Sequence, residues 1–282
     1  MEIITLVENL VYNGELKAEH GLAFLIKTKN CKILFDTGQT GIVVENAKIL
    51  GESLEDVDFI ILSHGHFDHT GGLEDVLKIN KTAKVIIKKE ALGEKYSNTT
   101  GNIREIGFKL MDKYKNYPNE FMILEDDYIL DKNIKIITEI KDYTDFEKIE
   151  QNLFIKDSNG YQIDPFEDEL FLIIEDDKKL NIITACSHTG IINILKSAVN
   201  KTKIDDINLI LGGMHISGSK LKDKTSQDKN NNKIELTIEE LKKMNIDKIY
   251  TNHCTGIDGF LKLKNAMGDK IYYSYTGSKI KI

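Results

Sequence analysis

The chain has 282 residues, of which 41% are hydrophobic and 29% charged, and its net charge is −7. These proportions are ordinary for a globular enzyme, and the length suffices for one large domain. The acidic balance argues against a nucleic-acid-binding protein. No apolar run approaches the roughly 20 residues that span a bilayer. Nucleic acid and membranes are therefore not expected as partners.

The cysteines are few and form no sequence pair. Cys31, Cys186 and Cys254 contain no Cys-x-x-Cys spacing, their number is odd, and no secretory leader precedes the first apolar run. Such a set is typical of a reducing compartment, because disulfides rarely persist there. We therefore expect a cytoplasmic protein in which Cys186 and Cys254 are small apolar fillers rather than nucleophiles.

Short apolar runs separated by turn residues predict strands along the whole chain. Apolar residues spaced three and four apart predict helices between them. This alternation is typical of α/β sheets flanked by helices. The predicted strands are 2–8, 22–28, 32–35, 59–62, 84–88, 169–175, 179–184, 207–211 and 248–251; the predicted helices are 41–50, 73–79 and 190–200, with another that starts at Thr237.

Two segments interrupt the alternation. Residues 90–165 hold irregular stretches and short strands, which predicts an inserted lid and hairpin region rather than an independent domain. Residues 217–235 are polar and of low complexity, which predicts a mobile loop. Thr237 with Glu240 three residues later has the pattern of a capping box at the start of the next helix.

The inserted region carries a candidate anion-binding group. Lys95, Tyr96 and Arg104 offer an ammonium, a phenol and a guanidinium within ten residues. A guanidinium matches phosphate or carboxylate geometry, so these residues are candidates for substrate binding. The alternative is a charged face that only contacts solvent.

One stretch concentrates metal-binding chemistry, because the apolar strand 59–62 is followed by three histidines and an aspartate. His64 and His66 lie two residues apart, so an extended backbone points both to one side. Asp68 and His69 follow where a helix can start. Imidazole nitrogens and carboxylate oxygens are ligands that zinc accepts. The stretch predicts a metal site, and a plain polar loop is the alternative.

Three further histidines lie at the ends of predicted strands. His188, His215 and His253 each follow a strand by one to four residues. Functional sites in open α/β sheets gather at the carboxyl ends of strands. Every histidine except His20 therefore lies where a site is expected, which favours a metal site independently of any single motif.

These motifs resemble those of the metallo-β-lactamase-fold hydrolases, in which His-x-His-x-Asp-His follows an apolar strand and precedes Thr-Gly-Gly-Leu. Finer motifs are similar to those of the branch named after 7,8-dihydropterin-6-methyl-4-(β-D-ribofuranosyl)aminobenzene-5'-phosphate synthase. They are Ala-Glu-His-Gly-Leu at 18–22, Lys-Tyr-Ser at 95–97, Cys-Ser-His-Thr-Gly-Ile at 186–191, Gly-Gly-Met-His at 212–215 and Asn-His-Cys-Thr-Gly at 252–256. The resemblance implies a four-layer αββα sandwich that spans 1–282 as a single domain, with a link to pterin or methanopterin-type metabolism.

The resemblance also implies two sets of metal ligands. They are His64, His66 and His188 for the first metal, and Asp68, His69 and His253 for the second. An alternative is that the segment around His188 corresponds to a metal-bridging motif. His188 would then lie near the second metal. Asp164 or Asp168 would replace the missing ligand, which is the metal-bridging aspartate that the family has where this chain has Gly-Gly-Met-His.

Three residues are expected to support these ligands. Asp36, at the end of a strand, would hold the ligand loop by hydrogen bonds without binding metal, as the resemblance implies. His215 is a candidate ligand, a candidate acid that protonates a leaving group, or a structural residue. His20 precedes Gly21 at a strand entrance, where a catalytic and a structural role are both open.

We predict a metal-dependent hydrolase that uses one or two zinc ions, with Mn²⁺ or iron as alternatives. A metal-bound hydroxide, oriented by Asp68, would attack a phosphoryl or carbonyl centre. His215 or His20 would protonate the leaving group. The expected substrate is a small-molecule phosphate ester or diester, and a homodimer remains open. An iron-dependent oxidoreductase and a nuclease are the alternative functions.

Overall fold

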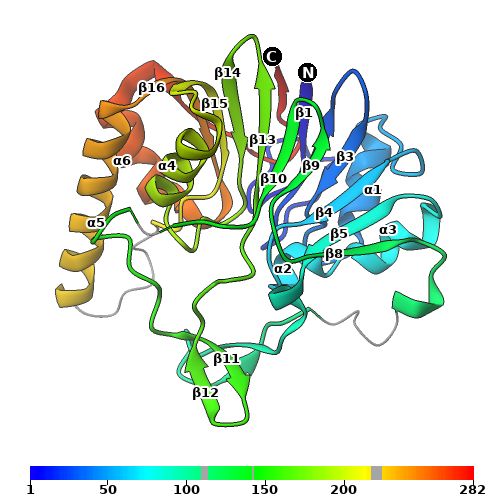
Figure 1. Ribbon diagram of the computed structural model, residues 1–282, viewed down its shortest axis with the longest axis horizontal. Coiled ribbons are helices and arrows are strands. Elements are labelled where there is room, and N and C mark those ends of the chain that lie inside the picture. Colours follow the sequence, from blue (N-terminus) through cyan, green and yellow to red (C-terminus); the bar gives the residue numbers. More distant parts are fainter. Residues whose placement is uncertain (109–113, 142, 217–223) are drawn as a thin grey trace. The chain divides into compact units, whose positions relative to one another are not determined.

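The computed structural model contains two compact units, each built around one seven-stranded sheet (Figure 1). None of the described helices is long and apolar enough to cross a membrane. The first unit comprises residues 1–125, 150–168 and 274–282, and the second comprises 126–149 and 169–273. The structure describes residues 1–108, 114–141, 143–216 and 224–282.

The sheet of the first unit has the order β18-β1-β2-β3-β4-β5-β8. Pairing is antiparallel from β18 to β3 and parallel from β3 to β8. The apolar runs of β4 and β5 are largely buried, as expected for parallel strands in the middle of a sheet. The strands are β1 Glu2–Val7, β2 Ala23–Lys27, β3 Lys32–Phe35, β4 Phe59–Leu62, β5 Lys84–Lys88, β8 Phe121–Leu124 and β18 Lys279–Lys281.

Helices α1 (Ile42–Ile49) and α3 (Leu73–Ile79) pack their apolar sides onto this sheet. Val43 and Ala47 of α1 and Val76 and Leu77 of α3 are buried in one core with the strands. The three- and four-residue spacing of these side chains is the pattern from which both helices were predicted. The one-turn helix α2 (Phe67–Thr70) lies between β4 and α3.

The sheet of the second unit has the order β17-β16-β15-β14-β13-β10-β9. Its strands β14 to β17 pair in parallel, and the others pair antiparallel. In each unit, therefore, the carboxyl ends of the parallel strands lie along one edge of that unit's own sheet. The strands are β9 Tyr128–Asp131, β10 Ile134–Ile137, β13 Phe171–Asp176, β14 Lys179–Ile183, β15 Asp206–Gly212, β16 Asn245–Thr251 and β17 Ile271–Tyr273.

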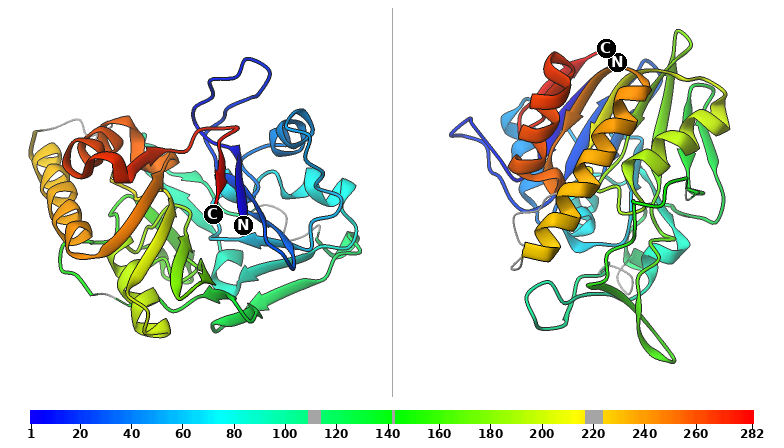
Figure 2. Two further views of the ribbon diagram at one scale, coloured as in Figure 1. Left: turned by 90° about the horizontal axis from the view of Figure 1, so that it is seen from above. Right: turned by 90° about the vertical axis from the view of Figure 1, so that its left-hand side faces the viewer.

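Three long helices pack against this second sheet: α4 (Ile191–Thr202), α5 (Lys224–Lys243) and α6 (Gly256–Met267) (Figure 2). The helix predicted for 190–200 is confirmed as α4. Helix α6 was not predicted, because glycines at 256 and 259 lower helix propensity over its first turns. Packing of Leu263 into the core compensates for that weak propensity.

The predicted loop at 217–235 is wrong from Lys224 onward, because α5 begins there, and 217–223 lie outside the described residues. Residues 224–243 contain no glycine or proline, so their polar composition does not stop a helix. Thr237 is accordingly not an N-cap; it lies inside the helix, where its hydroxyl donates to the carbonyl oxygen of Lys233 at 2.8 Å. Buried Ile234, Ile238 and Leu241 fasten this part of α5 to the core.

The region 90–165 contributes to three different sheets. β8 joins the first large sheet, and β9 and β10 join the second. The four-stranded sheet β12-β11-β6-β7 contains the remaining strands of the region, all in the first unit. These strands are β6 Lys95–Ser97, β7 Arg104–Glu105, β11 Leu153–Asp157 and β12 Gly160–Ile163. Short 3₁₀ helices lie at Lys89–Leu92, Tyr114–Asn116, His253–Thr255 and Gly268–Lys270.

Candidate metal centre

Three of the predicted ligands leave the carboxyl end of β4 as one buried cluster. His64, His66 and His69 are 0%, 5% and 0% exposed. The ring of His64 lies 4.5 Å from that of His66 and 4.3 Å from that of His69, measured between centroids. The backbone at His66 is extended and α2 starts immediately afterwards. This strand-to-helix transition brings residues that are five apart in sequence into contact.

Asp36 sets the orientation of two of these rings. Its carboxylate accepts hydrogen bonds from the Ser63 amide and hydroxyl, both at 2.8 Å, and from His69 Nδ1 at 2.7 Å. Because the single Ser63 hydroxyl proton goes to Asp36, His64 Nδ1 donates to Ser63 Oγ at 2.8 Å. Both rings therefore carry their proton on Nδ1, and Nε2 is the nitrogen available as a metal ligand.

Asp68 and His20 add oxygen and nitrogen donors to this cluster. Asp68 Oδ2 lies 3.7 Å from His69 Nε2 and 3.3 Å from His20 Nε2. Two ligands of one tetrahedral zinc ion are about 3.4 Å apart when each bond is about 2.1 Å. The donor types and spacings within the first unit therefore fit a zinc-like cation. The exposed His20 lies beside Asp68, which its position in sequence did not establish.

Burial keeps His64 and His66 neutral, which is the form that binds metal. It lowers the pKa of His64 well below its ordinary value and that of His66 to about 4. The neighbouring positive charge of Lys95 acts in the same direction, whereas Asp68 opposes it. Both imidazoles are consequently uncharged at neutral pH without any contribution from a metal ion.

The remaining predicted ligands lie in the second unit, on loops that follow three neighbouring parallel strands. His188 follows β14, His215 follows β15 and His253 follows β16. The rings of His188 and His215 are 4.4 Å apart between centroids. Two of the predicted strand-end histidines, His188 and His215, therefore lie side by side in this unit.

Hydrogen bonds join the three loops to one another. Ser187 Oγ donates to the carbonyl oxygen of Gly213 at 2.7 Å, and the Met214 amide donates to Thr255 Oγ1 at 2.9 Å. Cys254 Sγ lies 3.3 Å from the carbonyl oxygen of Cys186. Ser187 and Thr255 lie within motifs that the sequence analysis quoted, but their contacts with the other loops were not predicted, since a hydroxyl residue carries no signal of a contact with a distant loop.

Four of the eight described non-glycine residues with a positive φ lie in the candidate ligand loops or contact them. The φ angles of Asp36, Ser187, His215 and His253 are 60°, 58°, 45° and 48°, a region that non-glycine residues rarely occupy. Such residues persist only where the surrounding structure holds them, and they are common at functional sites. The strain therefore supports a functional rather than a purely structural role for the loops.

The proposed anion-binding group does not form as predicted. The Lys95 ammonium is buried and pairs with Asp164 at 2.8 Å and with Asp168 at 2.6 Å. The phenol of Tyr96, on the other face of β6, donates to Glu94, and Arg104 is exposed on β7. Lys95 thus binds carboxylates of the protein itself. Because successive side chains of a strand point to opposite faces, Lys95 and Tyr96 cannot contact one anion together.

The same ion pairs engage Asp164 and Asp168, the two candidates to replace a missing ligand, with groups of the protein itself. Asp164 also accepts the Phe166 amide at 2.8 Å, and Asp168 also accepts the Gly65 amide at 2.7 Å. Burial raises the pKa of Asp164. Burial alone would also raise that of Asp168, but the Lys95 charge outweighs it and holds the pKa below its ordinary value. Both oxygens of each carboxylate are therefore engaged.

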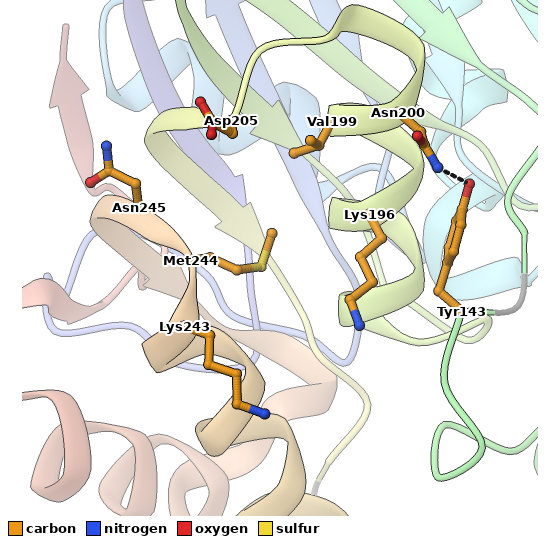
Figure 3. Close-up of a pocket in the computed structure, with 8 residues that line it drawn as sticks. All are labelled: Tyr143, Lys196, Val199, Asn200, Asp205, Lys243, Met244 and Asn245. Atoms are coloured by element: carbon orange, nitrogen blue, oxygen red, sulfur yellow. Dashed lines mark hydrogen bonds between the residues drawn. The ribbon is translucent and has the colours of Figure 1, made fainter.

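A pocket of about 450 Å³ lies elsewhere in the second unit, along α4 and the end of α5 (Figure 3). Lys196 and Lys243 on its wall both pair with Glu240, and Asn200 donates to the Tyr143 hydroxyl at 2.7 Å. The pocket is lined by Tyr143, Lys196, Val199, Asn200, Asp205, Lys243, Met244 and Asn245. None of these eight residues is a histidine or a cysteine, so the pocket contains none of the predicted metal ligands.

Comparison with known proteins agrees with the fold. Residues 16–192 match the metallo-beta-lactamase superfamily. A 7,8-dihydropterin-6-methyl-4-(beta-D-ribofuranosyl)-aminobenzene-5'-phosphate synthase from Methanocaldococcus jannaschii is 33% identical over 271 residues, 91% of this chain and 88% of the relative. Uncharacterized protein MJ0448 from the same organism is 33% identical over 280 residues, 98% of each chain.

A solved structure described as Tm1679, a metal-dependent hydrolase of the beta-lactamase superfamily, is also similar. It has a TM-score of 0.82 and 28% identity, and the match covers 100% of this chain and 99% of that one. The chain therefore belongs to the metallo-β-lactamase superfamily and has its α/β fold, as predicted. It is an enzyme of that superfamily, a metal-dependent hydrolase.

Proposed function

We propose that the chain is a zinc-dependent hydrolase of a small-molecule phosphate ester. In the first unit the proposed metal ligands are His64, His66, Asp68 and His69; in the second unit, taken by itself, they are His188 and His253. Zinc is favoured because neutral imidazole and carboxylate make up the whole donor set, a combination typical of catalytic zinc sites.

The observation that carries the proposal is the bonding of the two buried rings to Asp36 and Ser63. Directly or through Ser63, one carboxylate holds His64 and His69 with Nε2 as the nitrogen available for a metal. A carboxylate behind a ligand histidine fixes its tautomer and raises its basicity. A histidine cluster that served only packing would not require buried charge behind two rings, since burying a carboxylate is costly.

The chain's own groups suit the hydrolysis of an ester-like bond. A bound divalent metal would lower the pKa of water and stabilise negative charge that develops on the substrate. Asp68 would orient the attacking water by accepting a hydrogen bond. His20, with its Nε2 3.3 Å from Asp68 Oδ2, would protonate the leaving group when it carries a proton itself. His215, beside His188, is the second candidate for that proton transfer.

A phosphorylated small molecule is the substrate class best supported. The M. jannaschii relative is named for a dihydropterin compound that carries a 5'-phosphate, and its similarity extends over 91% of this chain. The net charge of −7 disfavours a long nucleic acid as substrate. We therefore expect activity on phosphate esters or diesters linked to pterin-type compounds, in a cytoplasmic setting.

Metal content tests this proposal directly. We expect protein purified without added metal to contain one or two zinc ions per chain by elemental analysis, and His64→Ala to lose at least one of them. Asn200→Ala is the control, because it removes only an exposed bond to Tyr143. Loss of zinc in His215→Ala would make His215 a ligand. Wild-type protein without bound metal would refute the proposal, and iron as the main metal would favour an oxidoreductase instead.

A further inference from the structure

Two adjacent acidic residues, Asp168 and Glu169, are buried immediately beside the candidate ligand loops. They are 0% and 1% exposed. The chain passes from the first unit to the second between them. Residues 164–170 connect β12 to β13, and this connection does not itself require a carboxylate at positions 168 and 169. Their burial as charged groups therefore needs another explanation.

Asp168 holds the backbone of the first ligand loop. Its Oδ2 accepts the amide hydrogen of Gly65 at 2.7 Å, and Gly65 lies between His64 and His66. The opposite side of Gly65 is closed by the main chain, because a Cβ there would lie 2.4 Å from the carbonyl oxygen of Ala91. The loop is therefore fixed from two sides at the residue that sets the relative orientation of both histidines.

The charge of Asp168 is maintained by a buried cation. Lys95 Nζ lies 2.6 Å from Asp168 Oδ1 and 2.8 Å from Asp164 Oδ2, and all three side chains are at most 2% exposed. Burial alone would lower the pKa of Lys95, but the two carboxylates outweigh it and raise that pKa. A buried ion pair contributes little net stability, so its value here lies in holding a defined geometry.

Glu169 holds the corresponding loop of the second unit. Its Oε1 accepts the His188 amide at 2.8 Å, and its Oε2 accepts the amide and hydroxyl of Thr189 at 2.9 and 2.5 Å. Ser187, the residue before His188, has the strained φ of 58°. Two charge-assisted hydrogen bonds from backbone amides and a third from the Thr189 hydroxyl thus hold the chain beside a strained residue, at the histidine that was predicted to bind metal.

We infer that Asp168 and Glu169 are positioning residues that preorganise the backbone of the His64–His66 loop and of the His188 loop for metal binding. The inference rests on the proposed metal site and assigns a role to residues that do not themselves bind the ion. Lys95 supports this arrangement as the counter-charge of Asp168. We assign it this role in place of the anion-binding role predicted from the sequence. Preorganised ligands bind metal more tightly because less conformational freedom is lost on binding.

Cobalt titration of metal-free protein tests the inference, with the visible absorbance of bound Co²⁺ as the readout. We expect Asp168→Ala and Glu169→Ala to weaken Co²⁺ binding about 10- to 100-fold and to alter the absorbance spectrum. Asp164→Asn is the matched control: it removes one of the two negative charges beside Lys95 but leaves the hydrogen bond from the Gly65 amide to Asp168. Its affinity is expected to stay within about threefold of wild type.

Two additional measurements separate positioning from simple loss of folding. The Lys95→Met/Asp164→Asn/Asp168→Ala variant removes all three buried charges, leaves no ion without a counter-charge, and should bind Co²⁺ as weakly as Asp168→Ala. Hydrogen exchange at the Gly65 amide of metal-free protein should accelerate in both, but not in Asp164→Asn. Wild-type affinity and spectrum in Asp168→Ala and Glu169→Ala would overturn the inference alone. Failure of wild-type protein to bind Co²⁺ would overturn the proposed function as well.

Discussion

Asp36→Ala is expected to destabilise the metal-free protein by about 3–5 kcal/mol and to weaken zinc binding by at least 10-fold. The carboxylate is fully buried and accepts three hydrogen bonds, two from Ser63 and one from His69. Its removal leaves the Ser63 amide and His69 Nδ1 without their acceptor in the interior, and each such loss is costly. The tautomers of His64 and His69 are then no longer set, so metal affinity falls as well.

Urea unfolding in the presence of a chelator measures the stability effect, and competition with a zinc indicator measures affinity. Asp58→Ala is a matched control, because this exposed carboxylate also accepts a backbone amide, that of Lys32 at 2.8 Å. We expect it to cost no more than about 1 kcal/mol and to leave zinc affinity unchanged. If Asp36→Ala and Asp58→Ala behaved alike in both measurements, the role given to Asp36 would be wrong.

The elements that carry the candidate ligands were predictable because their signals are local. The apolar run of β4 and the spacing of His64, His66 and Asp68 lie within ten residues, so neighbouring side chains are enough to define them. The helix α3 was likewise predicted with the bounds that the structure shows. Local patterns of this kind hold where burial and secondary structure favour the same arrangement.

The groups that hold these ligands were not predictable, because they come from distant parts of the chain. Asp168 is 103 residues from Gly65, and no spacing in the sequence connects them. Lys95 was assigned to a substrate because a lone lysine gives no sign of a carboxylate that approaches it from 69 or 73 residues away. Lysine is ordinarily exposed, so burial of its charge is the less expected outcome.

The helix α5 illustrates a different limit. Its first half is polar and asparagine-rich, which is typical of a loop, yet it is helical from Lys224. Composition alone does not distinguish a solvated helix from a solvated loop when glycine and proline are both absent. What decides the outcome is the packing of Ile234, Ile238 and Leu241 farther along the same helix, since helix formation is cooperative.

Metal-free protein is expected to lose about 3 kcal/mol of stability between pH 6.5 and pH 4 because of His66 alone. Burial lowers the pKa of this group from 6.5 to about 4 in the folded chain. Below pH 6.5 the unfolded chain takes up a proton that the folded chain does not, so acid favours unfolding. The effect is absent above pH 6.5, grows as the pH falls, and ends near pH 4, where the folded form is protonated too. Each pKa unit corresponds to about 1.4 kcal/mol.

Other groups contribute to the same curve, so the comparison with His66→Gln isolates the histidine. Burial raises the pKa of Glu147, so the folded chain binds a proton at this residue at a higher pH than the unfolded chain does, and acid favours folding there. Glu147 is present in both proteins, so its contribution cancels in the comparison. Urea unfolding with chelator present, at several pH values between 7 and 4, should show a pH dependence that is shallower for His66→Gln by about 3 kcal/mol in total. Identical pH dependence in the two proteins would mean that His66 takes up its proton equally easily in the folded and unfolded states.

With metal bound, the pH dependence of wild-type stability should steepen, because ligand histidines must release their protons to hold the ion and acid then removes the metal as well.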